Sequence, residues 1–302
     1  MDKFPSRARS SAATLAPRIS AVVIASNMRD GASGTTPLDL CLRSALSEDW
    51  IDDLVVVDHD NPAPISSALR AFEADRRDVR VVPVDASSSV AAAANLGARE
   101  ALGRWLLFLD ADVVLQRGSV ARMAAAAGGA RGPWIVGGRL LDLDGRDRTA
   151  ARAGSLNAFS AIAMAVDWPN RPRRRIPLDD TSATKVGAVS GAFMLIPRSD
   201  FNALSGFDPN FDTDYADLDL CRRASAAGGS VLFQHAAACV QFRFAKSRPH
   251  KLAQGLALFA SKSAKTPAEK AFAAIAEPAL AILVAVRNLV AGAPRAVRRP
   301  DR

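Results

Sequence analysis

The chain has 302 residues, 49% of them hydrophobic and 23% charged, with a formal net charge of +8. This composition excludes a disordered protein and can bury one large core or two modest ones, so we expect one elaborated α/β domain. Its cysteines, Cys41, Cys221 and Cys239, have spacings that offer neither a disulfide framework nor a CxxC metal motif, so we expect buried thiols in a reducing compartment.

The first predicted elements follow a short basic segment. Residues 1–17 lack the apolar stretch of a signal peptide, so we predict a disordered, uncleaved tail in the cytoplasm. Ile19 to Ala25 is almost entirely apolar, as in a parallel strand covered on both faces. After a loop, Thr36, Pro37 and Asp39 supply the N-cap, the N1 proline and the acidic first turn of a helix.

Short β-rich runs then alternate with helical stretches, which is the pattern of a parallel sheet with crossover helices. Strands are predicted at Leu54–Val57, Val79–Val84 and Trp105–Leu109. Helices are predicted at the alanine-rich Val90–Leu102 and at Ser119–Ala127, which two glycines follow.

The middle of the chain is less regular. A short strand is predicted at Ile135–Gly137 and a turn at Asp144-Gly145, and no clear period follows until about residue 185. Regular structure returns with predicted strands at Ala192–Ile196 and Val231–Phe233 and a helix around Asp217–Ala227.

Residues 246–302 are rich in Ala, Leu, Lys and Arg, which predicts a helical C-terminal segment. Thr266, Pro267 and Glu269 form a capping box with a proline at N1. The longest apolar run, Ala279–Val286, is far shorter than the roughly 20 residues that span a bilayer, so we expect no membrane crossing. The segment either lies on an anionic membrane surface or packs on the catalytic domain.

The positive charge gathers in two places. Such clusters suit nucleic acid, anionic lipid or a phosphate-bearing substrate, and a solvated charged face is the alternative. We expect no nucleic-acid partner, because the single tyrosine, Tyr215, and the scattered phenylalanines provide no stacking platform near the clusters. The clustered arginines are Arg171, Arg173, Arg174, Arg175, Arg287, Arg295, Arg298, Arg299 and Arg302.

Acidic side chains stand at the ends of predicted strands, where open α/β sheets bind ligands. In Asp110-Ala111-Asp112, alternation along an extended segment places two carboxylates on the same side. Mg²⁺ or Mn²⁺ takes carboxylate ligands together with substrate phosphates and stabilises a departing diphosphate; a helix N-cap pair is the alternative. Asp58 ends another strand, where it either binds a nucleoside or forms a turn.

Several motifs occur in the order and spacing of family 2 glycosyltransferases, which residues 19 to 245 resemble. The resemblance is greatest to the bacterial rhamnosyltransferase-like and exopolysaccharide branch. The motifs are Val22-Val23-Ile24, Val55-Val56-Val57-Asp58, Asn95-Leu96-Gly97, Leu109-Asp110-Ala111-Asp112, Ser190-Gly191-Ala192-Phe193-Met194, Gly206-Phe207-Asp208 and Asp217-Leu218-Asp219-Leu220-Cys221.

The resemblance implies a GT-A fold over residues 18–245, with a mixed sheet and flanking helices, and an inverting displacement at the anomeric carbon. Asp217 matches the general base, which fits the need of an acceptor hydroxyl to lose a proton as it attacks. The implied donor-nucleotide residues are Ala25, Asn27, Asp58, Asn95 and Asp110, the implied metal ligands are Asp112, Asp110 and Gln241, and the implied acceptor-side residues are Gly191 and Asp208.

Other interpretations of these carboxylates stay open. Asp217 is alternatively a structural carboxylate at a helix N-terminus, and Asp208 is alternatively a plain turn residue. Asp219 is predicted to be structural, with Arg223 one helical turn beyond as its partner.

Two positions depart from the family pattern. Ala216 stands where many relatives have Glu, and Gln241 stands where relatives often have a metal-binding His. An amide oxygen is a weaker ligand for a hard cation. The alternative function is therefore a degenerate member that binds nucleotide sugar or glycan as a scaffold. A pyrophosphorylase is disfavoured, because Asn27-Met28-Arg29 is a poor substitute for a glycine-rich, basic phosphate loop.

The combined prediction is an inverting, Mg²⁺- or Mn²⁺-dependent glycosyltransferase. The expected donor is a UDP-, GDP- or dTDP-sugar, and the expected acceptor is a lipid-linked glycan in surface or exopolysaccharide synthesis. We expect the protein in the cytoplasm, and the alternative is that it binds peripherally to the inner face of the cytoplasmic membrane.

Overall fold

A computed structural model describes residues 18–28, 36–130, 132–148, 151–154, 156–166, 182–212, 214–242 and 249–292. The predicted tail at 1–17 and the arginine clusters at 171–175 and 295–302 lie outside these residues. The described residues form two units. One comprises those within 18–156 and 182–242, and the other those within 157–166 and 249–292.

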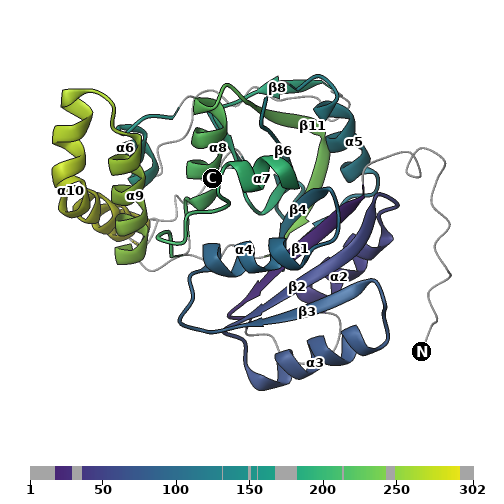
Figure 1. Ribbon diagram of the computed structural model, residues 1–302. Helices are drawn as coiled ribbons and strands as arrows, with labels where there is room; N and C mark the ends of the chain where they lie inside the picture. Colours follow the sequence, from purple (N-terminus) through teal and green to yellow (C-terminus); the bar gives the residue numbers. More distant parts are fainter. Residues whose placement is uncertain are drawn as a thin grey trace, which may run out of the picture. The chain divides into compact units, whose positions relative to one another are not determined.

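The first unit is built on a mixed sheet (Figure 1), which has nine strands within the described residues, in the order β3-β2-β1-β4-β10-β6-β11-β5 with β8 beside β11. Strands β1 to β4 are parallel, while β10 runs antiparallel to both β4 and β6. The strands are β1 (Ile19–Ser26), β2 (Ile51–His59), β3 (Val79–Val84), β4 (Trp105–Asp110), β5 (Val113–Leu115), β6 (Trp134–Leu141), β8 (Ala183–Lys185), β10 (Phe193–Pro197) and β11 (Ser230–Gln241). A separate two-stranded sheet pairs β7 (Arg152–Ala153) with β9 (Ala188–Val189).

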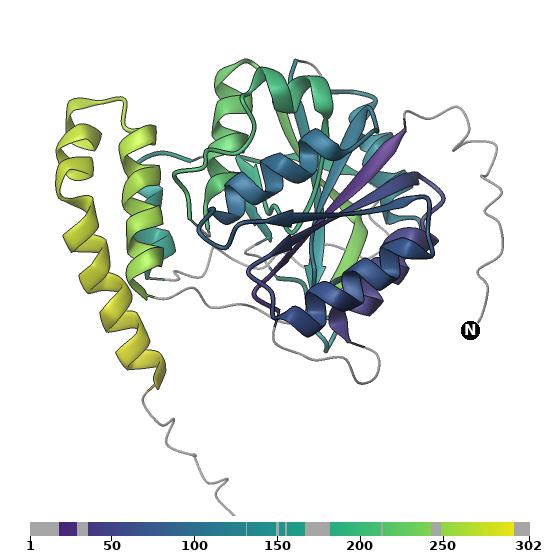
Figure 2. The ribbon, with the colours of Figure 1, turned by 60° about the horizontal axis from the view of Figure 1, so that its bottom comes forward.

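Helices flank the sheet, and Figure 2 shows α4 lying along the parallel strands. The close approach of α4 requires Gly97, because a Cβ there would lie 2.5 Å from Val57 Cγ2 and 2.7 Å from Val22 Cγ1. The helices of this unit are α2 (Pro37–Ser47), α3 (Ala63–Ala74), α4 (Val90–Glu100), α5 (Ser119–Ala127), α7 (Arg198–Ala203) and α8 (Ala216–Ala226). The core brings the Val, Ile, Leu and Phe side chains of β1, β2, β4 and β10 together with apolar residues of the other strands and of the flanking helices.

The predicted elements are present. One strand and one helix have the predicted bounds, and a second helix begins at the predicted residue. The strand Val79–Val84 and the helix Ser119–Ala127 have the predicted bounds. Thr36 caps α2 by accepting a hydrogen bond from the Asp39 N–H (3.1 Å). The predicted helix Val90–Leu102 ends earlier, at Glu100.

Other predictions were wrong in extent. Strand β11 has 12 residues where three were predicted, because the polar Gln234 and His235 interrupt its apolar pattern. Both are buried and hydrogen-bonded; His235 Nε2 lies 2.9 Å from Thr184 Oγ1 of β8. Helices α3, α6 and α7 were not predicted, although the buried Ile65 and Leu69 of α3 have the four-residue spacing of a helix face.

The second unit contains α6 (Ser160–Ala165), α9 (Pro249–Ser263) and α10 (Pro267–Gly292). The capping box is confirmed: Thr266 Oγ1 accepts from the Glu269 N–H at 3.2 Å, and Glu269 Oε2 accepts from the Thr266 N–H at 2.9 Å. Pro278 lies inside α10 without ending the helix.

The predicted apolar face of α10 is divided between two sides of the helix. Leu280 and Val284 are buried, whereas Ile275, Ile282 and Val286 are 60%, 64% and 51% exposed. In the part of the chain that the structure describes, no helix is both long and apolar enough to cross a membrane.

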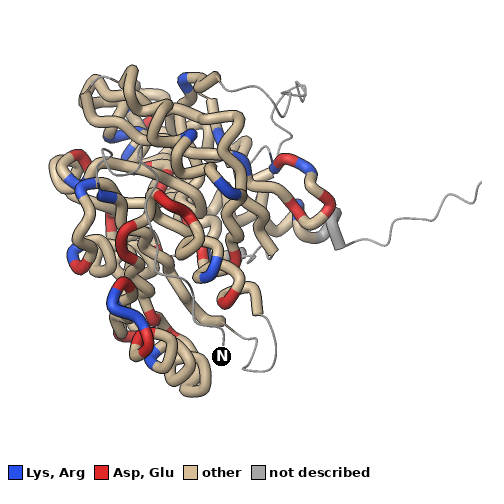
Figure 3. Tube along the Cα trace, turned by 90° about the vertical axis from the view of Figure 1, so that its right-hand side faces the viewer, with Lys and Arg blue, Asp and Glu red and all other residues tan. Residues whose placement is uncertain are grey.

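All three cysteines are buried and unpaired, as predicted. Burial raises the pKa of the Cys221 thiol to about 12, so this side chain stays protonated and unreactive. In the view of Figure 3, both the Lys and Arg positions and the Asp and Glu positions are scattered along the described chain.

Candidate active site

The Asp110-Ala111-Asp112 motif lies where β4 ends and the chain turns into β5. Gln241, the last residue of β11, pairs with Val113 of β5, and this pairing brings its amide to the motif. Gln241 Nε2 donates to Asp110 Oδ2 at 3.2 Å and to Asp112 Oδ1 at 3.3 Å. The three predicted metal ligands, distant in sequence, are therefore brought together.

The charges around Asp110 favour a cation. Burial, and then the carboxylates of Asp112, Asp217 and Asp214, raise the pKa of Asp110 to about 7, while the Gln241 amide opposes the rise. Crowded carboxylates repel one another, and a divalent cation would relieve the repulsion.

The donor set fits a hard cation that shares its shell with a substrate. Among the described residues, no three His, Cys, Asp or Glu side chains form a metal cage. Two carboxylates and one amide are instead the sparse oxygen set with which Mg²⁺ binds together with water and phosphate. To act as a ligand, the Gln241 amide must turn over, because its nitrogen now faces both acids.

Asp217 occupies the first turn of α8 and is held by backbone donors. Its Oδ2 accepts from the Gly191 N–H at 2.7 Å, and its Oδ1 accepts from the Leu218 N–H at 2.8 Å. A Cβ at residue 191 would lie 3.3 Å from Asp217 Cβ, so Gly191 keeps this contact close. Burial raises the pKa of Asp217 and the two N–H bonds lower it, with a net rise that favours a proton acceptor.

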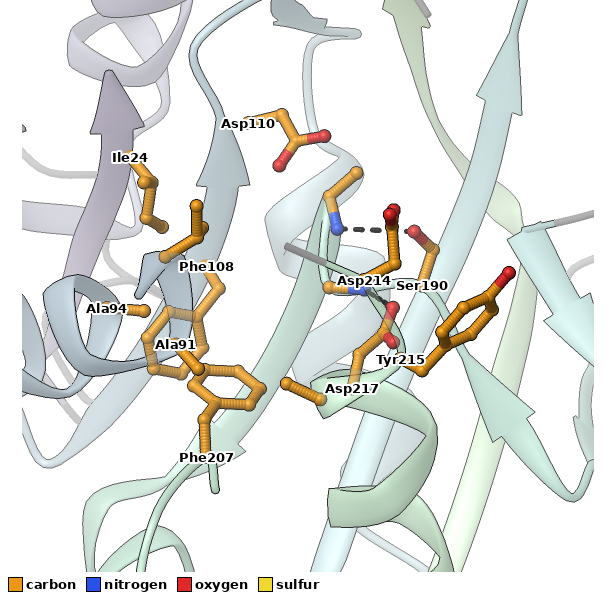
Figure 4. Close-up of a pocket in the computed structure, with 14 residues that line it drawn as sticks. Ile24, Ala91, Ala94, Phe108, Asp110, Ser190, Phe207, Asp214, Tyr215 and Asp217 are labelled. Carbon is orange, nitrogen blue, oxygen red and sulfur yellow. Dashed lines mark hydrogen bonds between the residues drawn. The ribbon is translucent and has the colours of Figure 1, made fainter. Parts of the chain in front are cut away.

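Asp110 and Asp217 line one cavity of about 190 Å³ (Figure 4). Its polar residues gather on one side, and Ile24, Phe108 and Phe207 form the opposite wall. The volume is below the roughly 300–1,000 Å³ of pockets that enclose a whole drug-sized ligand, so it suits one sugar unit. The predicted base, Asp217, and Asp110 of the predicted metal motif therefore border the same small space, whereas Asp112 and Gln241 are not among the residues that line it.

The predicted nucleotide residues Ala25, Asn27 and Asp58 lie at the carboxyl ends of the neighbouring strands β1 and β2. The Asn27 N–H donates to the His59 carbonyl at 3.1 Å. Asn61 Nδ2 donates both to the Ala25 carbonyl (2.7 Å) and to Asp58 Oδ1 (2.8 Å). These contacts give this edge of the sheet a defined shape.

Asn95 and Asp208 make contacts within the protein. The Asn95 amide donates to the Phe207 carbonyl at 2.7 Å and accepts from the Phe207 N–H at 2.9 Å, which holds a cavity wall in place. Asp208 Oδ1 accepts from the Asn210 backbone N–H at 2.9 Å, as the turn alternative predicts. Their contacts with donor and acceptor remain predictions.

The structural role of Asp219 is confirmed. This fully buried carboxylate contacts Arg223 Nε at 2.7 Å and Arg222 Nη2 at 2.9 Å. Arg223 in turn donates to the Gly206 carbonyl at 2.7 Å, which links α8 to the loop that carries Phe207.

Four residues of the site with polar side chains were not predicted. Ser190, Asp214 and Tyr215 line the cavity, and Asn61 anchors Asp58. Tyr215 adopts a left-handed backbone (φ 71°), which is unusual for a bulky residue and marks a constrained turn. Two features of the sequence could have indicated these residues. Asp214 lies close to Asp217 in the sequence, and Asn61 lies just after the end of a strand.

The sequence from residue 17 to 257 matches the model of a family described as glycosyltransferase like family 2. A comparison with curated proteins gives no match.

Solved structures resemble this chain at low identity. GalNAc-T7 with UDP, GalNAc and Mn²⁺ is 15% identical (TM-score 0.59), and the match covers 85% of this chain and 51% of that protein, so the chain spans about half its length. The mannosyltransferase PcManGT from Pyrobaculum calidifontis, in complex with GDP-Man and Mn²⁺, is 18% identical (TM-score 0.54; coverage 94% and 78%). S. aureus TarS 1-349 with UDP-GlcNAc is 13% identical (TM-score 0.52; coverage 90% and 73%).

Proposed function

The chain belongs to the glycosyltransferase-like family 2, and from this premise we propose that it transfers a sugar from a nucleoside diphosphate donor to a hydroxyl group of a glycan. Its fold is GT-A. The observation that carries the proposal is the single cavity lined by both Asp110 and Asp217, because direct displacement needs a cation site on one side of the sugar and a base on the other.

The donor's nucleotide end is proposed to lie over β1 and β2, against Ala25, Asn27 and Asp58. Its diphosphate would lie at the end of β4. Asp110, Asp112 and Gln241 would hold Mg²⁺ or Mn²⁺ there, and the bound cation supplies charge neutralisation for the diphosphate. The sugar would occupy the cavity between these residues and α8.

In the proposed reaction, Asp217 takes the proton of an acceptor hydroxyl as its oxygen forms a bond to the anomeric carbon. The bond from that carbon to the diphosphate breaks, and the electron pair leaves with the phosphate oxygen. Attack opposite the leaving group inverts the anomeric configuration. The two backbone N–H groups on Asp217 hold its carboxylate toward the cavity, which reduces the reorganisation needed.

The proposed acceptor is a lipid-linked glycan at the cytoplasmic face of a membrane, in synthesis of a surface polysaccharide. The exposed Ile275, Ile282 and Val286 on α10 support this location, since an apolar face followed by arginines suits an anionic membrane surface. Flotation with phosphatidylglycerol vesicles tests it. Binding should disappear when all three residues are replaced by Ser, and equal binding of that variant would refute the surface assignment.

The reaction class is tested by a donor screen. UDP-, GDP- and dTDP-sugars are assayed with and without Mn²⁺ for thermal stabilisation, since a ligand that binds only the folded state raises its apparent stability. Donors that stabilise the protein are then incubated with octyl glycosides, and released nucleoside diphosphate is measured. Asp112→Ala should lose the Mn²⁺-dependent part of the stabilisation, whereas Asp75→Asn, at the exposed C-cap of α3, should retain it. If none of the donors stabilises the protein, the proposal fails.

A scaffold that binds nucleotide sugar without turnover is the second candidate. Ala216 and the Gln241 amide favour it, because each replaces a group that would strengthen the base or the metal site. Donor binding without any release of nucleoside diphosphate, to glycosides or to water, would select this function.

A further inference from the structure

Tyr215 has a backbone conformation that suits few side chains. Its φ is +71°, in the left-handed region. Within the described residues, the other non-glycine residues with a positive φ are Asn27, Asp60 and Ser205. Asn and Asp are enriched in this region and serine is small, whereas a bulky residue there is an outlier. The turn at Tyr215 therefore carries a backbone strain that glycine would avoid.

The place of Tyr215 at the start of α8 does not explain a tyrosine either. Tyr215 is the N-cap, and its carbonyl accepts a helical hydrogen bond from the Asp219 N–H at 3.0 Å. N-cap positions favour Ser, Thr, Asp, Asn and Gly. The Tyr215 side chain makes no capping hydrogen bond. Glycine would thus serve both the turn and the cap at least as well as tyrosine does.

The ring of this tyrosine lies at the cavity of the proposed site. Tyr215 lines the cavity together with Ser190 and Asp217, and it is only half-buried. In Figure 4 the ring lies on the same side as Ser190, away from Phe108 and Phe207. The ring therefore borders the part of the site that contains the proposed base.

An aromatic ring at this place matches the shape of a sugar. A pyranose presents C–H groups on its faces and hydroxyl groups around its edge. An apolar sugar face can pack against the aromatic ring, while the phenol hydroxyl stays in water or bonds a sugar hydroxyl. The carboxylates of Asp214 and Asp217, which line the same cavity, would accept from hydroxyl groups at the sugar's edge. The sugar that needs Asp217 is the acceptor, because its hydroxyl must lose a proton.

We propose that Tyr215 is an acceptor-binding residue, whose ring packs against the face of the acceptor pyranose while Asp217 takes the proton of the attacking hydroxyl. The strain at residue 215 is retained because glycine would make the same turn without the ring. This inference rests on the proposed function, since it takes Asp217 as the base, and it adds a residue that recognises the acceptor.

Tyr215→Gly separates the ring from the turn. Its urea unfolding midpoint should equal or exceed that of the wild type, because the strain is removed. For octyl glycosides that the wild type uses as acceptors, kcat/KM should fall by at least about tenfold, the loss expected for one aromatic contact. The Mn²⁺-dependent stabilisation by the donor should be unchanged. Tyr215→Phe keeps the ring, so its kcat/KM should stay within about threefold of the wild type.

Ser205→Gly is the matched control. It removes another side chain from a positive-φ position (φ 63°) at an exposed site, and it should leave kcat/KM for the acceptor at the wild-type value. A lower urea midpoint of Tyr215→Gly, or an equal loss of donor stabilisation, would assign the ring to the fold and overturn the inference. Unchanged kcat/KM for the acceptor in Tyr215→Gly would overturn it as well.

Fluorine labelling tests the contact without any variant. Tyr215 is the single tyrosine of the chain, so protein made with fluorotyrosine gives one fluorine NMR resonance. With the donor's nucleoside diphosphate and Mn²⁺ present, an octyl glycoside that serves as acceptor should shift this resonance, and octanol should not. An unmoved resonance overturns the inference even when transfer occurs. If donors bind but no glycoside accepts the sugar, the scaffold function is selected and the inference falls with the proposed transfer.

Discussion

Asp110 is the position where the charge balance of the site can be measured directly. Burial and the carboxylates of Asp112, Asp217 and Asp214 raise its pKa from 3.8 to about 7. At pH 8, without a cation, the folded protein must carry this charge beside other acids. Asp110→Asn keeps the size and removes the charge, so the variant should be more stable than the wild type under these conditions.

The magnitude follows from the pKa difference. A rise of roughly three units corresponds to at most about 4 kcal/mol, at 1.36 kcal/mol per unit. Asp110 is only half-buried, so water screens part of the repulsion, and we expect about 1–2 kcal/mol. Because folding raises this pKa, the part of the wild type's stability that depends on the protonation of Asp110 is fully present below the unfolded value of 3.8. That part is lost as the pH rises through the folded value of about 7.

Urea unfolding in EDTA at pH 8 and pH 4.5 checks this prediction. The variant should exceed the wild type at pH 8, and most of the difference should be gone at pH 4.5. Asp75→Asn, an exposed carboxylate at the end of α3, serves as the control and should show no such pH dependence. Equal stability at pH 8, or the same difference at both pH values, would refute the charge argument.

Three further variants test the remaining parts of the site and its support. Asp217→Asn keeps the shape but loses the base, so transfer should fall by at least about 100-fold with nearly unchanged donor affinity; ordinary initial rates would remove Asp217 from this role. Gln241→His places an imidazole beside Asp110 and Asp112 and should lower the Mn²⁺ concentration needed for half-maximal donor stabilisation, whereas an unchanged requirement would place residue 241 outside the cation shell. Gly97→Ala puts a methyl group 2.5 Å from Val57 Cγ2 and should cost about 1–3 kcal/mol in urea unfolding, and a cost near zero would show that α4 can shift.

The family and the fold followed from local motifs, because the apolar strands and the residues at their ends occur in the order and approximate spacing of family 2 glycosyltransferases. The same motifs led to the GT-A fold, which the family match and the structural likeness confirm. The placement of Gln241 with Asp110 and Asp112 also agrees with the predicted metal site, although the roles of these residues remain to be tested.

Other features depended on contacts between segments that sequence spacing does not relate. Asn61 gave no periodic signal, since its importance comes from reaching Ala25 and Met28 across two strand ends. Asp214 joins the cavity only because the chain turns at Tyr215 before α8 begins. The assignment of α6 to the C-terminal unit likewise has no local signature.

The sequence alone thus determined the order of the predicted strands and helices, the carboxylates at strand ends and the structural role of Asp219 with Arg223, because backbone alternation and helical spacing act over a few residues. Only the tertiary structure decided that Asp110 and Asp217 line one cavity and that Asn61 donates a hydrogen bond to Asp58. These outcomes depend on sheet register and loop conformation, which are fixed by contacts between side chains far apart in the sequence.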